Sequence, residues 1–142
     1  MFIFNEGTID LPPDWKDQTI NIVSSASAMQ PGLTVSITRD TLPWGMGFTE
    51  YVDDQIGQVA DGLNEFKLLG KRNLVISRAA ACEIECSWQS KQGAMHQVIT
   101  TVQLEDNKAI IVTASLPGKM TDSQLTEVRR IVSTLSLQPR RS

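Results

Sequence analysis

The sequence predicts an α+β fold: a curved antiparallel β-sheet with helices packed on it. Short segments in which apolar and polar residues alternate indicate antiparallel strands, and two segments whose apolar residues recur every three or four positions indicate amphipathic helices. The chain has 142 residues, of which 41% are hydrophobic, so it can bury one core of ordinary size. We therefore expect residues 1–142 to form a single domain.

The chain begins with a predicted hairpin formed by residues 2–4 and 8–11. Gly7 lies between them, where the turn is expected to need a positive φ. The Pro12-Pro13 pair ends the hairpin, because proline donates no hydrogen bond to a strand ladder. Trp15 follows, and we expect its indole to anchor the chain against the sheet.

Two strands are predicted next, over residues 18–25 and 33–40. In the first, Ile20 and Ile22 alternate with their neighbours and give one apolar face, which something must cover. In the second strand one face carries small hydroxyl side chains, namely Thr34, Ser36 and Thr38.

Residues 48–64 predict a helix, because apolar side chains recur at helical spacing from Phe48 to Leu63. Thr49 is its expected N-cap. Gly57 and Gly62 weaken this helix by up to about 1 kcal/mol each relative to alanine. Two interpretations of the glycines stay open: they let a partner approach closely, or they are tolerated defects.

A β meander is predicted from Leu68 onward, with strands around residues 80–88, 95–104 and 109–116. If Asp106 and Asn107 are the central residues of the last turn, Gln103 faces Ile110, Thr101 faces Val112 and Ile99 faces Ala114. Apolar side chains then fall on both faces of the sheet, and the helices are expected to cover one of them. The remaining apolar surface needs a loop, a second subunit or a ligand.

A second helix is predicted after Pro117-Gly118. Thr121 and Gln124 fit a capping box, in which each residue's side chain bonds to the other's backbone. The buried stripe of this helix is expected to contain Leu125, Val128, Val132 and Leu135.

Charge and hydropathy argue against several classes of partner. The formal net charge is -3, and no basic run precedes the terminal Arg140-Arg141, so we expect no nucleic-acid partner. No apolar run approaches the ~20 residues needed to cross a bilayer, so direct membrane insertion is not expected. The N-terminus lacks the features of a signal peptide, which favours a cytoplasmic location.

Cys82 and Cys86 are the two cysteines of the chain. On one strand they would lie about 13 Å apart, too far for a disulfide. We expect both to be small buried hydrophobic residues in a reducing compartment.

We find no motif for catalysis, for a cofactor or for a metal. His96, the single histidine, shares a predicted face with Glu85 and Ser87, which leaves a hydrolase open as a minor alternative to a solvent-facing strand. Glu83 and Glu85 are expected to be solvated. One histidine and two strand cysteines do not make a zinc site.

The order of several short motifs resembles the DcrB-like family, and within it the Eag proteins, the effector-associated chaperones of bacterial type VI secretion systems. The resemblance covers almost the whole chain. The motifs are Asn5-Glu6-Gly7, Leu11-Pro12, Asp14-Trp15 with Asp17, Thr19-Ile20-Asn21-Ile22, Ile37-Thr38-Arg39-Asp40, Tyr51-Val52 with Gln55, Phe66-Lys67-Leu68, Trp88 and Gln97-Val98.

This resemblance implies a PsbP-like fold and a cytoplasmic, homodimeric chaperone or adaptor that is not an enzyme and has no cofactor. Eag chaperones bind the N-terminal transmembrane helices of effectors, often of the Rhs type with a PAAR domain, and shield them before loading on the secretion spike. The alternative is an envelope-associated DcrB-like binding domain without a chaperone role.

The resemblance also implies which residues bind the effector helix in a hydrophobic groove. The apolar ones are Ile20, Ile22, Val59 and Leu63, and the hydrogen-bonding ones are Thr34, Ser36, Thr38, Gln55 and Gln97. Trp88 is expected in the core, whereas Trp44, in a glycine-rich loop, is expected to be exposed and able to touch a partner.

Overall fold

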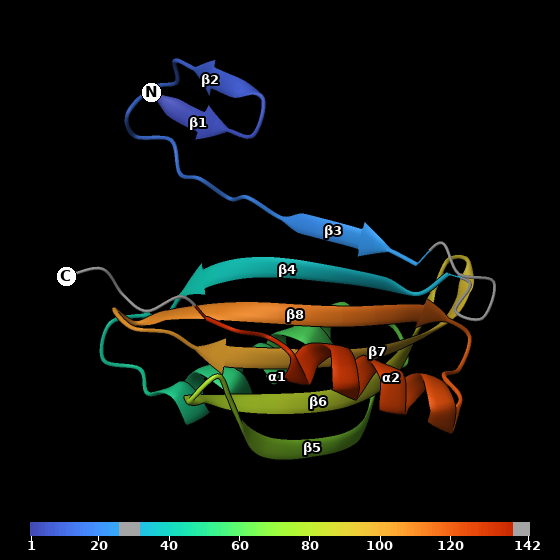
Figure 1. Ribbon diagram of the computed structural model, residues 1–142. Coiled ribbons are helices and arrows are strands. Elements are labelled where there is room, and N and C mark those ends of the chain that lie inside the picture. The colour runs from blue at the N-terminus through green and yellow to red at the C-terminus, as the bar shows by residue number, and fades with distance from the viewer. Residues whose placement is uncertain (26–31, 138–142) are drawn as a thin grey trace.

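The computed structural model describes residues 1–25 and 32–137. Over those residues the chain forms a six-stranded antiparallel sheet, a separate two-stranded hairpin and two helices (Figure 1), which confirms the predicted α+β fold. The strand order in the large sheet is β3-β4-β8-β7-β6-β5. The elements are β1 (Phe2–Phe4), β2 (Gly7–Ile9), β3 (Asn21–Ser24), β4 (Thr34–Thr41), α1 (Phe48–Gly62), β5 (Lys67–Ile76), β6 (Ala79–Ser90), β7 (Gly93–Gln103), β8 (Lys108–Pro117) and α2 (Asp122–Ser133).

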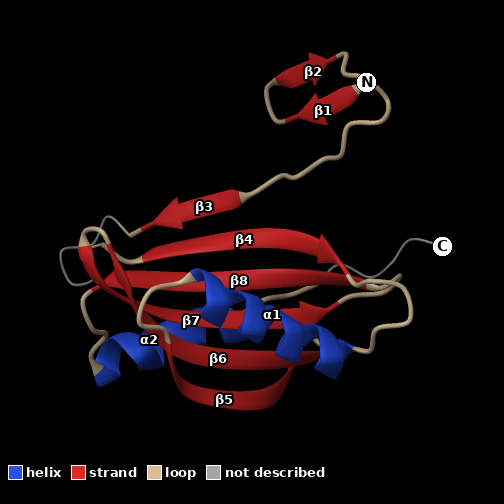
Figure 2. Ribbon diagram, turned by 180° about the vertical axis from the view of Figure 1, so that it is seen from behind, coloured by secondary structure: helices blue, strands red, loops and turns tan. Residues whose placement is uncertain are grey.

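The two helices lie on opposite faces of the large sheet. Figure 1 shows α2 in front of the sheet, and Figure 2, seen from behind, shows α1 in front of it. Val128 of α2 packs with Val98 and Ala114, whereas Val52 of α1 packs with Cys82. The prediction that the helices cover one face is wrong. Alternate residues of the strands point to opposite faces, apolar side chains occur on both faces, and one helix packs on each. We call the two sides the α1 face and the α2 face.

A β-bulge shifts the pairing of β7 and β8 by one residue from the predicted register. Asp106 and Asn107 are the central turn residues as predicted, with φ of 60° and 57°. The N–H of Lys108 bonds to the Glu105 carbonyl at 3.3 Å, while the Lys108 carbonyl accepts from the N–H of Leu104 at 2.8 Å. Two residues of one strand thus oppose one of the other, which is the geometry of a bulge.

The bulge changes which side chains of β8 meet which helix. Thr101 pairs with Ile111 and not with Val112, and Ile99 pairs with Thr113 and not with Ala114. Ile111 therefore lies on the α1 face. Val112, which pairs with Thr100, lies on the α2 face.

The N-termini of the two helices are capped differently. The predicted capping box of α2 is confirmed: Thr121 Oγ1 accepts from the N–H of Gln124 at 3.1 Å, and Gln124 Oε1 accepts from the N–H of Thr121 at 2.9 Å. The predicted cap of α1 is wrong, because its N-cap is Gly47 and not Thr49.

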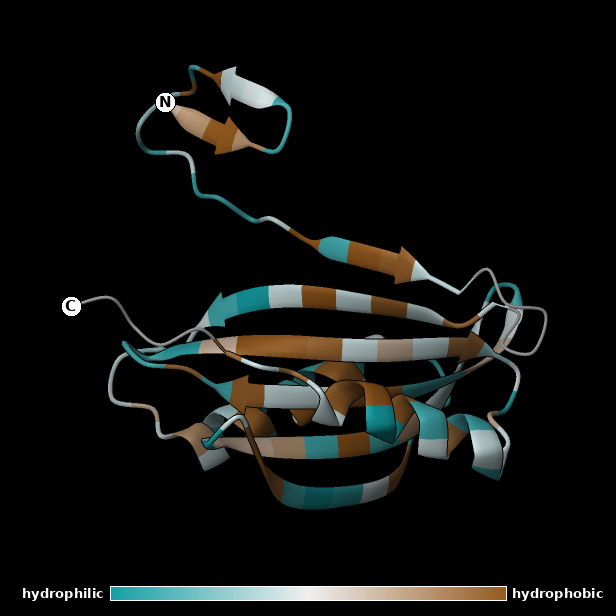
Figure 3. Cartoon of the chain, in the orientation of Figure 1, coloured by the Kyte–Doolittle hydropathy of each residue, from teal (hydrophilic) through white to brown (hydrophobic). Residues whose placement is uncertain are grey.

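The N-terminal arm, residues 1–18, runs away from the large sheet and ends in the β1–β2 hairpin (Figures 1 and 3). Gly7 begins β2 and is not among the residues with positive φ, so that expectation is wrong. Trp15 is 65% exposed and lines a hollow of about 480 Å³ formed by the arm itself, together with Met1 and Leu11. Trp15 therefore packs with the arm and not on the sheet, so the expected contact with the sheet is wrong.

Candidate binding face

The pairing of β4 places its small hydroxyl residues on the α1 face. Ser36 pairs with Thr113 of β8, which pairs with Ile99 of β7. Ile99 packs against the cluster that holds α1 on the sheet. Because alternate residues of a strand share a face, Thr34 and Thr38 lie beside Ser36 on this side. All three hydroxyl residues are half-buried.

The two isoleucines predicted in the site lie at the open edge of the same face. Ile22 of β3 pairs with Ser36 and is 66% exposed, and Ile20, just before the strand, is 55% exposed. Arg39 ties this segment to β4, since its Nη1 donates to Asn21 Oδ1 at 2.6 Å. The apolar side chains of this strand are thus left uncovered by the rest of the chain that the structure describes.

Two side-chain contacts fix the rotation of α1 over its face. The Tyr51 hydroxyl donates to Asp40 Oδ2 of β4 at 2.6 Å, and Lys71 Nζ of β5 lies 2.7 Å from Asp53 Oδ1. Burial, the hydrogen bond and the charge of Asp40 all raise the pKa of Tyr51. Gln55 lies one helical turn after Tyr51 and therefore on the flank that faces β4.

The stripe of α1 that faces the sheet is closed at its start and more open at its end. Val52 is buried, and Ile56 packs in the same cluster as Val52. Val59 and Leu63 follow these residues by two helical turns and are half-buried. The second half of α1 therefore leaves apolar side chains partly accessible above the sheet.

Gln97 holds a fixed place on the α1 face through two side-chain hydrogen bonds. Trp88 Nε1 donates to Gln97 Oε1 at 2.9 Å, and Gln97 Nε2 donates to Ser115 Oγ at 3.0 Å. Ser115 pairs with Thr34, whose Oγ1 lies 3.5 Å from Ser24 Oγ. We call Trp88, Gln97, Ser115, Thr34 and Ser24 the polar row.

The sequence prediction missed the roles of Trp88 and Ser115. Trp88 is half-buried, but its indole N–H belongs to the polar row, so core packing is an incomplete description of it. The predicted register placed Leu116 opposite Gln97, whereas the structure places Ser115 there. The correct β7–β8 register was the information needed to find the row.

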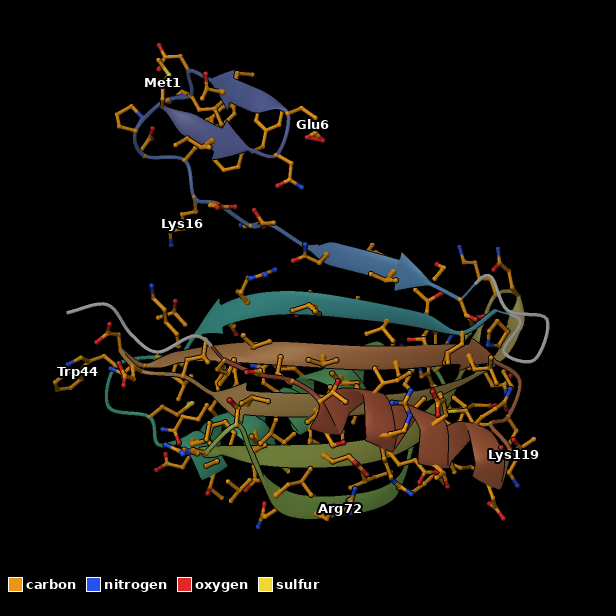
Figure 4. The ribbon with its side chains drawn as sticks, viewed as in Figure 1. Met1, Glu6, Lys16, Trp44, Arg72 and Lys119 are labelled. Atoms are coloured by element: carbon orange, nitrogen blue, oxygen red, sulfur yellow. The ribbon has the colours of Figure 1, made fainter. Side chains whose placement is uncertain are left out.

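The structure thus places the predicted site residues on one side of the sheet. They come from α1, from β4 and β7, and from the segment that contains Ile20 and Ile22. The glycines of α1 make no close contact there, because a Cβ added at Gly57 or Gly62 would meet nothing within 4 Å. Trp44 projects from the loop between β4 and α1 and is 97% exposed, as predicted (Figure 4).

The α2 face buries charged side chains that were expected to be in water. Glu83 is 4% exposed; its Oε2 accepts from Arg72 Nη2 at 2.9 Å and its Oε1 from Arg129 Nε at 3.0 Å. Burial raises the pKa of Glu83, but the hydrogen bonds from the two guanidinium groups outweigh burial and lower it. The prediction of solvated glutamates is wrong because α2 covers this face and brings Arg129 to it.

His96 is a structural residue at the start of α2. Its ring is 2% exposed, Nδ1 accepts from the N–H of Met120 at 2.8 Å, and Nε2 lies 2.8 Å from Glu85 Oε2. The expected solvent-facing position is therefore wrong. Because both ring nitrogens are engaged and the ring is buried, this geometry gives no support to a hydrolase centred on His96.

Both cysteines are free and buried, as predicted. Burial raises the pKa of the Cys86 thiol to about 11 and also raises that of Cys82, so neither thiol is an effective nucleophile near neutral pH. Within residues 1–25 and 32–137 we find no group of three His, Cys, Asp or Glu side chains placed to hold a metal ion. In the same part of the chain, neither helix combines the length and the apolar character needed to cross a bilayer.

Comparison with known proteins agrees with the fold and with the resemblance. A Pseudomonas aeruginosa protein named Effector EagT6 is 26% identical over 114 residues, which cover 80% of this chain and 78% of that protein. The crystal structure of protein PA94 from Pseudomonas aeruginosa matches with a TM-score of 0.80 and 21% identity, over 98% of this chain and 96% of the other. The solution structure of cyanobacterial PsbP (CyanoP) from Synechocystis matches with a TM-score of 0.51 and 11% identity, over 81% of this chain and 77% of the other.

These likenesses confirm the predicted DcrB-like and PsbP-like fold. The family model DcrB matches residues 6–134, which is most of the chain. The chain therefore belongs to the DcrB family.

Proposed function

We propose that the chain is a cytoplasmic chaperone that binds N-terminal transmembrane helices of a type VI secretion effector of the Rhs/PAAR type. It shields these helices on its α1 face until the effector is loaded on the secretion spike. Membership of the DcrB family and the likeness to EagT6 support this proposal. The role is that of a binding protein without catalytic residues.

The observation that carries the proposal is the mixed character of the α1 face. A transmembrane helix in water exposes ~20 apolar residues, so a chaperone must replace lipid. Exposed Ile22 and the half-buried Val59 and Leu63 offer apolar contacts on one side of the sheet. Membrane helices also pack through small and polar side chains, so a good substitute for a neighbouring helix needs hydrogen-bonding groups among the apolar ones.

The hydrogen-bonding groups of this face have suitable positions. Thr34, Ser36 and Thr38 form a line along β4, and the pairing of Ile22 with Ser36 puts an exposed apolar side chain next to that line. Gln55 lies on the flank of α1 that faces the same strand. In the proposed complex the isoleucines and α1 side chains contact the apolar part of the effector helix, and the hydroxyl and amide groups contact its polar side chains.

The N-terminal arm supports a homodimer. The exposed large apolar side chains of the arm are Met1, Ile3, Phe4, Ile9 and Trp15. An isolated two-stranded hairpin is marginally stable in water, so the arm needs a surface to pack on. We infer that a second copy supplies this surface. The native mass should be that of a dimer, and removal of residues 1–18 should reduce it to that of a monomer.

Co-expression with the N-terminal membrane segment of an effector encoded beside this chain's gene tests the proposal. We expect a soluble complex with the unmodified chain and a loss of most of the recovered effector segment with Ile22→Asp, because a carboxylate at an exposed apolar contact opposes burial of the helix. Val75→Asp is the matched control: Val75 pairs with Ala80 and is 75% exposed on the α1 face, but it lies on β5, at the opposite edge of the sheet from Ile22. It should leave recovery unchanged, because the proposed contacts lie along β3, β4 and α1.

Thermal unfolding of each variant shows whether a lower recovery of the effector segment reflects weaker binding or a variant that does not fold. Full recovery with a folded Ile22→Asp variant would remove Ile22 from the binding face. Absence of any complex with the unmodified chain would contradict the chaperone role itself. Fractionation that places the chain in the periplasm or the membrane would favour the envelope-associated binding domain.

A further inference from the structure

We propose that Trp88 and Ser115 are positioning residues that hold the Gln97 amide in one orientation and so make the α1 face prefer an apolar helix that carries a single hydrogen-bonding side chain. The inference rests on the proposed function, because it specifies which helices that face selects. It assigns to Trp88 and Ser115 a role in recognition in addition to packing.

The donor and acceptor chemistry of the row fixes the amide orientation. The indole N–H of Trp88 can donate and cannot accept, so the atom of Gln97 at 2.9 Å from it must be the oxygen Oε1. The amide nitrogen Nε2 then points to Ser115 Oγ at 3.0 Å. A flipped amide would set two donors against each other at Trp88. The amide is thus locked by chemistry as well as by shape.

The locked amide keeps unused hydrogen-bonding capacity. A glutamine side chain offers two N–H donors and two acceptor lone pairs, and the bonds to Trp88 and Ser115 use one of each. One N–H and one lone pair remain. Gln97 is half-buried, so a helix that covers the α1 face would take these groups out of water.

The neighbours of Gln97 on the same strand face are apolar. Alternation along β7 places Met95 and Ile99 on either side of it, and Cys86, its partner on β6, is fully buried. An all-apolar helix packed here would leave the remaining amide groups without partners. A helix with an asparagine, glutamine, serine or threonine at this point would satisfy them, because such side chains both donate and accept.

A binding experiment with two synthetic probes tests the inference on the full chain. Both probes are helices of ~20 leucine and alanine residues with lysines at each end, one with asparagine and one with leucine at the centre. The measured quantity is the ratio of their affinities, obtained by fluorescence anisotropy of labelled probes. We expect Trp88→Phe, which keeps an aromatic ring and loses the N–H, to lower the preference for the asparagine probe about tenfold, or about 1.4 kcal/mol.

Two further variants complete the test. Ser115→Ala removes the other bond to the amide with little change in volume and should shift the ratio in the same direction. Trp44→Phe, in the exposed loop, is the matched tryptophan control and should leave the ratio unchanged. Thermal unfolding identifies any variant that does not fold. If Trp88→Phe does not fold, the affinity ratio of Ser115→Ala decides the result.

The possible results separate this inference from the proposed function. If the unmodified chain binds neither probe, the chaperone role on the α1 face is overturned, and the inference with it. If it binds both and the variants weaken both probes equally, Trp88 and Ser115 act on packing alone, and their positioning role is overturned while the chaperone role stands. A selective loss of the asparagine probe supports the inference.

Discussion

The two faces of the large sheet are built from alternate residues of the same strands, yet they are closed to different degrees. On the α2 face, the helix is held at its start by His96 and along its length by Arg129, and side chains such as Val98 are almost completely buried. On the α1 face, the hydroxyl residues of β4 are half-buried. At the β3 edge both sides are open, because Ile22 on the α1 side and Val23 on the α2 side are each 66% exposed.

Under the proposed function, this difference lets one sheet serve stability and binding together. The closed face buries apolar area and satisfies its charged groups internally, which stabilises the fold. The open face keeps apolar and hydrogen-bonding groups accessible, which costs stability in the free chain and leaves these groups for the proposed effector helix.

The largest expected difference between the two faces is the loss of stability when a side chain is shortened, because a cavity forms only on the closed face. Val98→Ala should lower the free energy of unfolding by about 2 kcal/mol, because Val98 is 1% exposed and packs with Val128 and Leu116. Ile22→Ala should change it by less than about 0.5 kcal/mol. Urea denaturation measures both. A loss at Ile22 as large as that at Val98 would show that Ile22 is covered in solution.

A smaller effect concerns the buried charge of the α2 face. Arg129→Ala should cost about 1 kcal/mol at neutral pH, because Glu83 loses one of its two guanidinium partners, with the value reduced by the partial exposure of Arg129. Arg130→Ala is the control: Arg130 pairs with Glu127 on the outer side of the helix, and its removal should not measurably change stability.

The pH dependence of the Arg129→Ala effect follows from the direction of the shift. The folded-state pKa of Glu83 lies below its ordinary value of 4.5, so its stabilising contribution is complete above that pH and is lost as the pH falls through the lower folded-state pKa. The difference between the unmodified chain and Arg129→Ala should therefore narrow in acid. A constant difference down to about pH 2 would show that Glu83 is not the responsible partner.

The smallest expected effect is a gain. Gly57→Ala should raise the free energy of unfolding by about 0.5–1 kcal/mol, since Gly57 lies inside α1 and an added Cβ would have no neighbour within 4 Å. Gly57 follows Asp53 by one turn and so lies on the flank of α1 toward β5. Recovery of the effector segment should stay unchanged. If recovery falls while stability rises, the glycine admits a partner and is not a tolerated defect.

Local patterns predicted the elements well. Alternation found the strands of the meander, apolar spacing found both helices, and the pairing of Thr121 with Gln124 located the start of α2. These features depend on residues close together in the chain. Placement of Thr34, Ser36 and Thr38 on a shared strand face followed from alternation alone.

What failed depended on contacts between distant residues. The expected register could not include the bulge at Leu104 and Glu105, which depends on the backbone conformation of the turn. Glu83 has the polar character of a surface residue, and its burial follows from Arg129, 46 positions later. The polar row was missed for the same reason, because Ser115 and Gln97 meet in a register that the turn alone did not give.

The bulge before Lys108 has a consequence for how insertions and deletions act on this chain. Removing one residue there would rotate β8 by half a period, so that Val112 and Ala114 would point to α1 while Ile111, Thr113 and Ser115 would point to α2. The residues of β8 itself would be unchanged, yet its hydroxyl side chains would point into the tightly packed interior under α2. A length change in a short surface connection would thus be more damaging here than most substitutions in the strands it joins.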